Sequence, residues 1–338
     1  MTMIRGWAVH APKEKLELFT FDAGQLGSDE VEIDIEHCGI CHADLSMIKN
    51  EWGMSQYPLI PGHEVVGKVS GLGSHVQNLQ IGQRVGVGWN AISCMHCHEC
   101  MTGQHNLCAK AVPTMVGRQG GYADKIRTHW AWAIPLPQTI ESADIGPLMC
   151  GGIAVFAPLL VYNIKPTDHI GIIGVGGLGH MGIKFAKAWG CEVTAFTSQP
   201  EKAQDAKAFG AHHVVSSRDS AAILKMASTL DMLMVTSDVT LDWQSLMKTL
   251  KPNGRLHMLG AVLEPLSISA LDLIFGQKNI SGSPTGSPAM LSAMLEFAAR
   301  HDIKPKVEHF PMSKVNEALA HLEQGKARYR IVLDNDFA

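Results

Sequence analysis

GIIGVGGLGHMG, residues 171–182, sets the architecture of the middle of this 338-residue chain. Its glycines follow an apolar run and precede a stretch with helical periodicity, which together form the G-x-G-x-x-G fingerprint of a dinucleotide-binding turn. Such a turn brings backbone N–H groups and the positive end of a helix dipole to a pyrophosphate. We therefore predict a dinucleotide site rather than a plain loop. The turn residues assigned to it are Gly174, Gly176, Gly177, Leu178 and Gly179.

Beyond this turn the chain alternates between strand and helix patterns. The expected helices run through Lys184 and Trp189 and through Gln204 and Phe209. The expected strands have the sequences HIGIIG, EVTAF, HHVVSS, DMLMVT and RLHMLG. Such alternation is typical of a parallel, doubly wound α/β sheet. We predict a Rossmann cofactor-binding domain over residues 151–286.

The second of these strands indicates which nicotinamide cofactor is bound. Enzymes that use NAD usually carry Asp or Glu about 20 residues beyond the glycines, where the carboxylate binds the ribose hydroxyls. Here the strand ends in Thr197 and Ser198, and Lys202 follows shortly after. Two hydroxyls and a lysine can instead bind a 2′-phosphate. The alternative is that Lys202 is a solvated helix residue whose charge Glu201 offsets. The missing acid favours NADP(H) over NAD(H).

The beginning and the end of the chain have a different pattern. Short β-rich runs punctuated by Gly and Pro, such as VEIDIEHCG, HEVVGKVSGLG and IGQRVGVGW, predict an antiparallel, barrel-like domain. After about Ser287, a helix over PAMLSAMLEFAAR and a mixed α and β stretch close the sequence. We place this β-rich domain at residues 1–150, completed by residues 287–338.

Four cysteines lie within fifteen residues, in the run CMHCHECMTGQHNLC. Two-residue gaps let neighbouring sulfurs converge on one ion and a longer gap closes the loop, which is the spacing of a structural zinc site. A disulfide pair or a redox dithiol is the alternative, but Cys-x-x-Cys redox motifs have two sulfurs rather than four. A segment with so little apolar surface would need a metal to hold its shape. The predicted ligands are Cys94, Cys97, Cys100 and Cys108.

A second set of metal-binding residue types is spread along the chain. Cys41 lies in CGICHADL, His63 and Glu64 lie in PGHEVVG, and Cys150 lies in GPLMCGGI. The Cys, His, Cys combination is that of a zinc dehydrogenase site with one position open for water or substrate. Each residue also has an ordinary interpretation, since Cys150 could be a small buried hydrophobe and His63 a core histidine.

Composition argues against several classes of function. The chain is 46% hydrophobic and 18% charged, with a formal net charge of −4, and it shows no basic stripe for nucleic acid or acidic membranes. The N-terminal sequence MTMIRGWAVHAPKEKLELF lacks the uninterrupted apolar core of a signal peptide, and the most apolar run, around residues 153–162, is short and contains Pro158. We therefore expect a cytoplasmic protein whose eight cysteines are thiols and metal ligands.

These motifs carry a family resemblance. GICHADL, PGHEVVG, the four-cysteine run, GGIAVF and GVGGLG occur in the order and spacing of the zinc-dependent medium-chain dehydrogenase/reductase superfamily. The chain resembles in particular the cinnamyl alcohol dehydrogenase group and its bacterial broad-specificity, NADPH-dependent aldehyde reductases. The resemblance implies a GroES-like first domain and an active site in the cleft between the domains. It also implies a homodimer joined through the Rossmann sheets near SISALDLIFGQKNISGS, with a tetramer as the alternative.

The same resemblance implies roles for individual residues. Cys41, His63 and Cys150 would bind a catalytic zinc, and Glu64 would lie behind that ion or enter its shell transiently. Asp44 would orient a ligand from behind. His42 would contact the pyrophosphate of the cofactor. The implied reaction is reversible hydride transfer between NADPH and aliphatic or aromatic aldehydes, with zinc as the Lewis acid.

Two positions depart from the family pattern. Relatives generally carry Ser or Thr where this chain has Ala43, and they tend to have Thr where it has Ala154. Both changes remove hydroxyls expected near the reacting atoms, so the family's proton relay cannot be transferred to this chain. Ser46, one helical turn beyond Ala43, is the nearest hydroxyl in sequence and one candidate for the replacement. A bound water and the cofactor ribose, reached through His42, are the alternatives.

Aromatic residues near the ligand-bearing segments are candidates for the wall of a substrate pocket, although ordinary core packing would explain each equally well. They are Trp52, Tyr57 and Trp89. The sequence leaves two alternative functions. An NAD-dependent polyol or threonine dehydrogenase should carry the acid that Thr197 replaces. A zinc-stabilised structural or interaction protein would keep the four cysteines but has no use for an open metal site and a dinucleotide turn.

Overall fold

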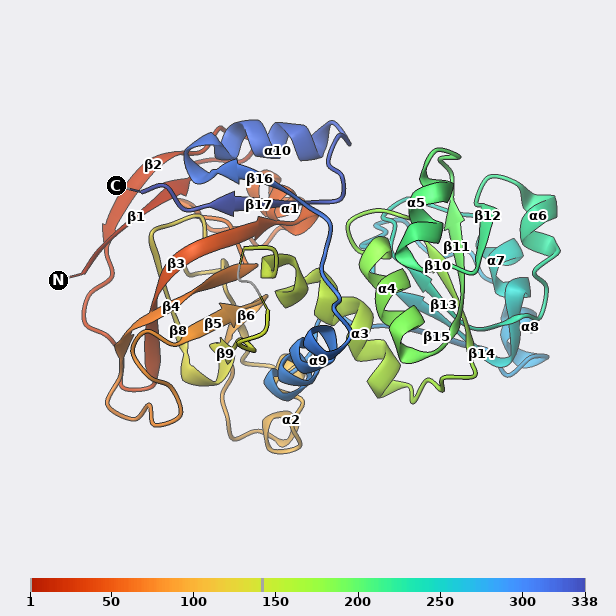
Figure 1. Cartoon of the computed structure of the whole chain (residues 1–338), viewed down its shortest axis with the longest axis horizontal. Coiled ribbons are helices and arrows are strands. Elements are labelled where there is room, and N and C mark those ends of the chain that lie inside the picture. Colours follow the sequence, from red (N-terminus) through yellow and green to blue (C-terminus); the bar gives the residue numbers. More distant parts are fainter. Residues whose placement is uncertain (1, 141–142, 338) are drawn as a thin grey trace. The chain divides into compact units, whose positions relative to one another are not determined.

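The computed structural model describes residues 2–140 and 143–337, and the chain separates into two units (Figure 1). The first unit contains the residues up to Ile153 and those from Thr285 onward, and the second contains Ala154–Pro284. The outer limits predicted for the β-rich domain, residues 1 and 338, lie outside the described residues. Among the described residues, no helix has both the length and the apolar character that crossing a membrane requires.

The second unit is built on a six-stranded parallel sheet with the order β12-β11-β10-β13-β14-β15. The strands are β10 (His169–Ile173), β11 (Glu192–Thr197), β12 (His213–Ser216), β13 (Leu230–Val235), β14 (Leu250–Met258) and β15 (Asn279–Gly282). The direction of the strand order reverses between β10 and β13, which is where doubly wound folds bind ligands. The predicted fold class is confirmed, whereas β15 lies outside the predicted strands.

Helices cover both faces of this sheet. The bounds are α3 (Gly151–Val161), α4 (Gly179–Trp189), α5 (Lys202–Phe209), α6 (Ser220–Leu224), α7 (Trp243–Thr249) and α8 (Ala270–Ile274). Helices α4 and α5 contact each other on one face, and α6, α7 and α8 form a second group on the other (Figure 1). Helix α3 packs on α4. The Phe156 ring of α3 meets the Phe185 and Trp189 rings of α4 edge to face.

The main sheet of the first unit has the order β16-β17-β3-β4-β5-β9, and β8 also pairs with β3. The strands are β3 (Glu30–Ile40), β4 (Val65–Leu72), β5 (Arg84–Val87), β8 (Lys125–His129), β9 (Ile134–Pro135), β16 (Val307–Pro311) and β17 (Arg330–Asp334). All of these pairs are antiparallel except β16 with β17. Strand β17 pairs directly with β3, so the closing segment of the sequence completes the sheet.

Period-two patterning explains the long central strand β3. Val31, Ile33 and Ile35 are at most 4% exposed, while Asp34 between them faces outward. The remaining elements of this unit flank the sheet. They are β1 (Met3–Ala8), β2 (Glu17–Asp22), β6 (Asn90–Ile92), β7 (Val112–Pro113), α1 (His42–Lys49), α2 (His98–Met101), α9 (Pro288–Arg300) and α10 (Val315–Glu323).

A buried histidine connects the last two strands of the parallel sheet. The His257 ring on β14 lies 2.9 Å through Nδ1 from the Ser281 hydroxyl and 3.0 Å through Nε2 from that of Ser283. One serine can accept from the ring N–H while the other donates to the bare nitrogen, so the neutral ring is fully satisfied. Burial, reinforced by the charge of Arg255, lowers the pKa of His257 to about 4.

We expect acid to destabilise the second unit through this histidine. Its folded pKa lies below the ordinary value of 6.5, so its contribution to the unfolding free energy is complete above pH 6.5 and is lost as the pH falls toward 4. The shift corresponds to at most about 3 kcal/mol. His257→Gln keeps a donor and an acceptor but does not titrate. Urea unfolding between pH 7 and pH 4.5 should therefore show a shallower loss of stability for this variant, and identical slopes would contradict the assignment.

Candidate functional site

Three predicted metal ligands converge in the first unit. Cys41 precedes α1, His63 precedes β4 and Cys150 precedes α3. The Cys150 sulfur lies 3.9 Å from the Cys41 sulfur and 3.2 Å from Nε2 of His63. With Glu64 included, one ligand atom of each residue lies within 4.8 Å of the others. Ligand atoms of a tetrahedral zinc with nitrogen and sulfur donors lie about 3.6 to 3.8 Å apart. The two sulfurs are close to this spacing, the nitrogen and the Cys150 sulfur are closer together, and the donor set is that of a zinc site.

Asp44 holds this arrangement from behind. Its Oδ2 accepts the backbone N–H of Cys41 at 2.7 Å, and its Oδ1 accepts the N–H of Gly62 at 3.0 Å and Nδ1–H of His63 at 3.1 Å. Because Nδ1 donates to a carboxylate, Nε2, on the side occupied by Cys150, is the nitrogen that would bind a metal ion. Burial opposes a charged imidazole, yet the adjacent Asp44 carboxylate raises the pKa of His63 well above its usual range.

The thiols and the carboxyl group at this site have shifted pKa values. The hydrogen bond from Cys150 holds the pKa of the Cys41 thiol well below its usual range, and the same bond raises the pKa of Cys150. Burial raises the pKa of Glu64 to about 7, against the opposing charge of Arg330. Oε1 of Glu64 accepts a hydrogen bond from Arg330, while Oε2 is buried with no hydrogen-bond partner in the described part of the chain.

Arg330 was missed by the sequence reasoning. It lies on β17, where it is 4% exposed and forms an ion pair with the fully buried Glu64. A signal was present, because an arginine that precedes the apolar residues Ile331–Leu333 in a strand is a candidate for a buried ion pair. Its partner could not be named, since Glu64 lies 266 residues away in the sequence.

Two of the three predicted pocket aromatics lie beside the metal-ligand set. The Trp89 ring meets the His63 ring edge to face, with centroids 5.1 Å apart, and it meets the Trp52 ring at 6.0 Å. Tyr57 is engaged differently, because its hydroxyl donates to the carbonyl oxygen of Ile48 in α1 at 3.1 Å. Trp89 thus contacts His63 and Trp52, whereas the Tyr57 hydroxyl is hydrogen-bonded to α1.

The residues near the start of α1 are placed as follows. His42, the first residue of the helix, is exposed. Ala43 follows it and has no hydroxyl. The Ser46 hydroxyl is buried and donates to the Glu51 carboxylate at 2.7 Å. Its proton is therefore directed at a group outside the metal-ligand set.

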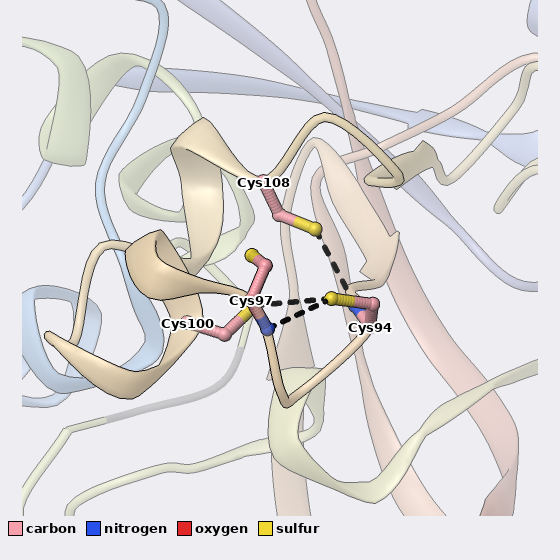
Figure 2. Close-up of side chains that lie close together, drawn as sticks. All are labelled: Cys94, Cys97, Cys100 and Cys108. Carbon is pink, nitrogen blue, oxygen red and sulfur yellow. Dashed lines mark hydrogen bonds between the residues drawn. The ribbon is translucent and has the colours of Figure 1, made fainter.

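The four cysteines of the lobe also converge, and Figure 2 shows their side chains pointing toward one another. Their sulfurs lie within 4.8 Å of one another, and all four are free thiols. The Cys97 N–H donates to the Cys94 sulfur and the Lys110 N–H donates to the Cys108 sulfur, each at 3.3 Å. Backbone donors favour the thiolate form, and the N–H of His96 leads those that lower the pKa of Cys94 to about 6. Four thiolates at this spacing fit a tetrahedral zinc.

In the second unit, the carboxyl ends of neighbouring strands line a cavity of about 630 Å³. This volume lies within the range of small-molecule and cofactor sites. The predicted cofactor residues in its lining are Gly174, Gly176, Thr197, Ser198 and Lys202. The turn beneath it depends on glycine, because a Cβ on Gly179 would collide with the carbonyl oxygen of Gly174.

Not every predicted cofactor residue lines this cavity. Gly177, Leu178 and Gly179 belong to the same turn but not to the lining, and His42 lies in the first unit. The lining also contains residues that sequence reasoning missed, namely Gln199, Ser217, Arg218 and the segment 236–242 after β13. Parallel strands end at one edge of the sheet, so the residues after β12 and β13 could have been considered from the strand pattern.

Comparison with known proteins gives the family. Residues 27–138 match the alcohol dehydrogenase GroES-like domain, and residues 177–300 match the zinc-binding dehydrogenase domain. The chain is 49% identical to the aldehyde reductase AdhA of Synechocystis sp. over 98% of this chain and 99% of the relative. It is 39% identical to a probable cinnamyl alcohol dehydrogenase 6 of Arabidopsis thaliana, over 97% of this chain and 93% of the relative.

Solved structures agree. A cinnamyl alcohol dehydrogenase of Sorghum bicolor superposes with a TM-score of 0.95 at 37% identity, and one of Helicobacter pylori, complexed with NADP(H), superposes with 0.90 at 30% identity. Both comparisons cover 98% of each chain. The chain therefore belongs to the zinc-dependent medium-chain dehydrogenase/reductase family, in the cinnamyl alcohol dehydrogenase group, and is an alcohol dehydrogenase or aldehyde reductase.

Proposed function

We propose that the protein catalyses reversible hydride transfer between NADPH and aldehydes, producing primary alcohols from aliphatic and aromatic substrates. The observation that carries this proposal is the convergence of Cys41, His63 and Cys150, oriented by a fully buried Asp44 and bordered by aromatic rings. The relatives named as an aldehyde reductase and as cinnamyl alcohol dehydrogenases support the same chemistry.

In this proposal Cys41, His63 and Cys150 hold a catalytic zinc, with Glu64 adjacent to it. Bound zinc supplies Lewis acidity that polarises the aldehyde oxygen. The protein's own residues prepare the donor atoms. Asp44 fixes the imidazole tautomer, the low pKa of Cys41 favours its thiolate, and Arg330 restrains the carboxylate of Glu64. A second, structural zinc is assigned to the four cysteines of the lobe.

Substrate would be bound beside the Trp52 and Trp89 rings. The Trp89 ring covers one side of His63, and the Trp52 ring packs against Trp89. This apolar surface would exclude water from the reacting atoms and strengthen the electrostatic interactions there. Tyr57, whose hydroxyl is bonded to α1, would contribute only the face of its ring. Ser46 stays our candidate proton donor, and this role requires its bond to Glu51 to break.

We assign the cofactor to the second unit, which corresponds to the predicted Rossmann domain of residues 151–286. The turn of residues 174–179 and the N-terminus of α4 would bind the pyrophosphate. His42 keeps its expected role as a basic contact to that pyrophosphate. Thr197, Ser198 and Lys202 would surround the adenosine ribose, with hydroxyls and a positive charge where an NAD-dependent enzyme carries an acid. The NADP(H) bound by the Helicobacter pylori relative supports this choice.

Initial rates of turnover, measured for a panel of substrates with each nicotinamide cofactor, distinguish the proposed reaction from its alternatives. Short aliphatic aldehydes and benzaldehyde should be reduced with NADPH at rates well above those with NADH. Faster turnover of polyols or threonine with NAD would instead favour a polyol or threonine dehydrogenase. A protein whose intrinsic fluorescence does not respond to NADPH, and which reduces no aldehyde, would contradict an enzymatic role.

We expect two zinc ions per chain with different roles. Cys150→Ser should abolish turnover and leave thermal unfolding nearly unchanged, because the open site adds little to the fold. Cys100→Ser should lower the melting temperature by at least about 5 °C, since the lobe relies on its metal. Elemental analysis that finds one zinc or none in freshly purified protein would contradict this prediction.

We expect the absent acid at position 197 to determine cofactor preference. Thr197→Asp places a negative charge beside the 2′-phosphate and should move the ratio of kcat/KM values toward NADH by at least about tenfold, or about 1.4 kcal/mol. The new carboxylate can still accept the N–H of Gln199, which the Thr197 hydroxyl accepts at 3.2 Å. Thr197→Asn, of the same shape but neutral, is the control and should shift the ratio much less. Equal wild-type efficiency with NADPH and NADH would refute the prediction.

We also propose a homodimer joined through β15. This strand has β14 as its only neighbour in the sheet of the described residues, so it presents an unpaired edge. Exposed apolar residues gather in the sequence around that edge. They are Leu263, Leu271, Ile274, Phe275 and Ile280, of which Phe275 is 85% exposed. A monomer in size-exclusion chromatography with light scattering would contradict the dimer, and twice the dimer mass would indicate a tetramer.

A cytoplasmic location is proposed as well. All eight cysteines are free in the structure, as expected of thiols kept in a reducing compartment. Recovery of the native protein in an oxidising compartment, with its lobe cysteines paired as disulfides, would contradict this location.

A further inference from the structure

The segment after β12 brings a second cation to the cofactor cavity. Strand β12 pairs with β11 so that Ser216 lies beside Thr197, and the N–H of Ser217 donates to the Thr197 carbonyl oxygen at 3.0 Å. Arg218 is the next residue in the chain, so it lies near Thr197, the position at which an NAD-dependent enzyme carries an acid. It lines the same cavity as Lys202, the first residue of α5.

The guanidinium of Arg218 has no hydrogen bond or ion pair within residues 2–140 and 143–337, although its backbone N–H donates to the Ser216 hydroxyl at 3.3 Å. The nearest acid in sequence, Asp219, is engaged elsewhere. Its Oδ1 caps α6 by accepting the N–H of Ala222 at 3.0 Å. An exposed guanidinium at the wall of a cavity is available to an anionic ligand, and its planar fork can bind two phosphate oxygens at once.

The charges in the cavity are separated along the sheet. The cations Lys202 and Arg218 follow β11 and β12, whereas the acids Asp238 and Asp242 follow β13. Strands β11 and β10 lie between β12 and β13 in the sheet. The cations and the acids therefore lie at opposite ends of the cavity lining. A ligand with a phosphate at one end is therefore favoured in the orientation that directs this phosphate toward the end of β12.

We propose that Arg218 is a specificity-determining residue that binds the 2′-phosphate of NADPH together with Lys202. The inference rests on the proposed use of NADP(H). A phosphate monoester carries about −1.5 to −2 charges at pH 7, which one lysine leaves partly uncompensated. Arg218 supplies the bidentate contact and Lys202 supplies a point charge. NADH has no group for the guanidinium to bind, so Arg218 acts on one cofactor and not on the other.

Two small nucleotides isolate this contact. Adenosine 2′,5′-bisphosphate contains the 2′-phosphate, and 5′-AMP lacks it, so titration calorimetry with both measures the phosphate's contribution. Arg218→Gln should weaken binding of the bisphosphate at least about tenfold and change binding of 5′-AMP less than about twofold. Arg218→Lys, which keeps the charge but loses the fork, should fall between the two proteins. In steady-state assays Arg218→Gln should raise the KM for NADPH while kcat and the KM for NADH stay near wild type.

Controls separate this inference from the proposal beneath it. Arg300→Gln removes the same charge from an exposed position on α9 and should leave both nucleotides unaffected. If the wild-type protein binds the two nucleotides equally, the NADP(H) assignment itself is wrong. If the wild type prefers the bisphosphate and Arg218→Gln keeps that preference, or weakens both nucleotides equally, the assignment of Arg218 is overturned while NADP(H) use stands.

Discussion

The buried carboxylate of Asp44 is the constraint on which the metal-ligand geometry depends. It joins the start of α1 to the segment before β4 by accepting hydrogen bonds from Cys41, Gly62 and His63. These three hydrogen-bond donors offset the free-energy cost of burying the Asp44 charge. A carboxylate without such donors would be strongly disfavoured in a buried position. The same bonds fix the backbone of one metal ligand and the ring of another. Asp44 therefore couples the local fold directly to the chemistry of the site.

The two sites compensate charge in opposite ways. Around the predicted metal ligands, Glu64 and Arg330 are buried and already paired with each other. At the cavity of the second unit Arg218 is exposed and unpaired within the described residues, so its charge is available to a ligand. A buried, internally paired site keeps its geometry during repeated reactions, whereas an open cation can bind and release a soluble cofactor.

Local patterns predicted the parts of the structure that depend on neighbouring residues. The glycine turn, the alternation of strands and helices, and the helix PAMLSAMLEFAAR, which is α9 in the structure, are all encoded within short stretches. Strand β15 was missed because its four residues, NISG, have little hydrophobic alternation, and only pairing with β14 makes them a strand. Arg330 was missed as a site residue because its role exists only through Glu64, which is distant in the sequence. The convergence of Cys41, His63 and Cys150 was accessible because motifs, rather than propensities, identify those residues.

The pairing of β17 with β3 has a consequence for the order of synthesis. The second unit is one continuous stretch, so all of its strands have been made before the first unit has its complete sequence. The sheet of the first unit stays open along β3 until residues 330–334 have been added, and Glu64 has no guanidinium beside it during that time. A nascent chain therefore carries an unneutralised carboxylate next to three potential zinc ligands. The predicted metal ligands are translated early, but the environment that controls their charge is translated last.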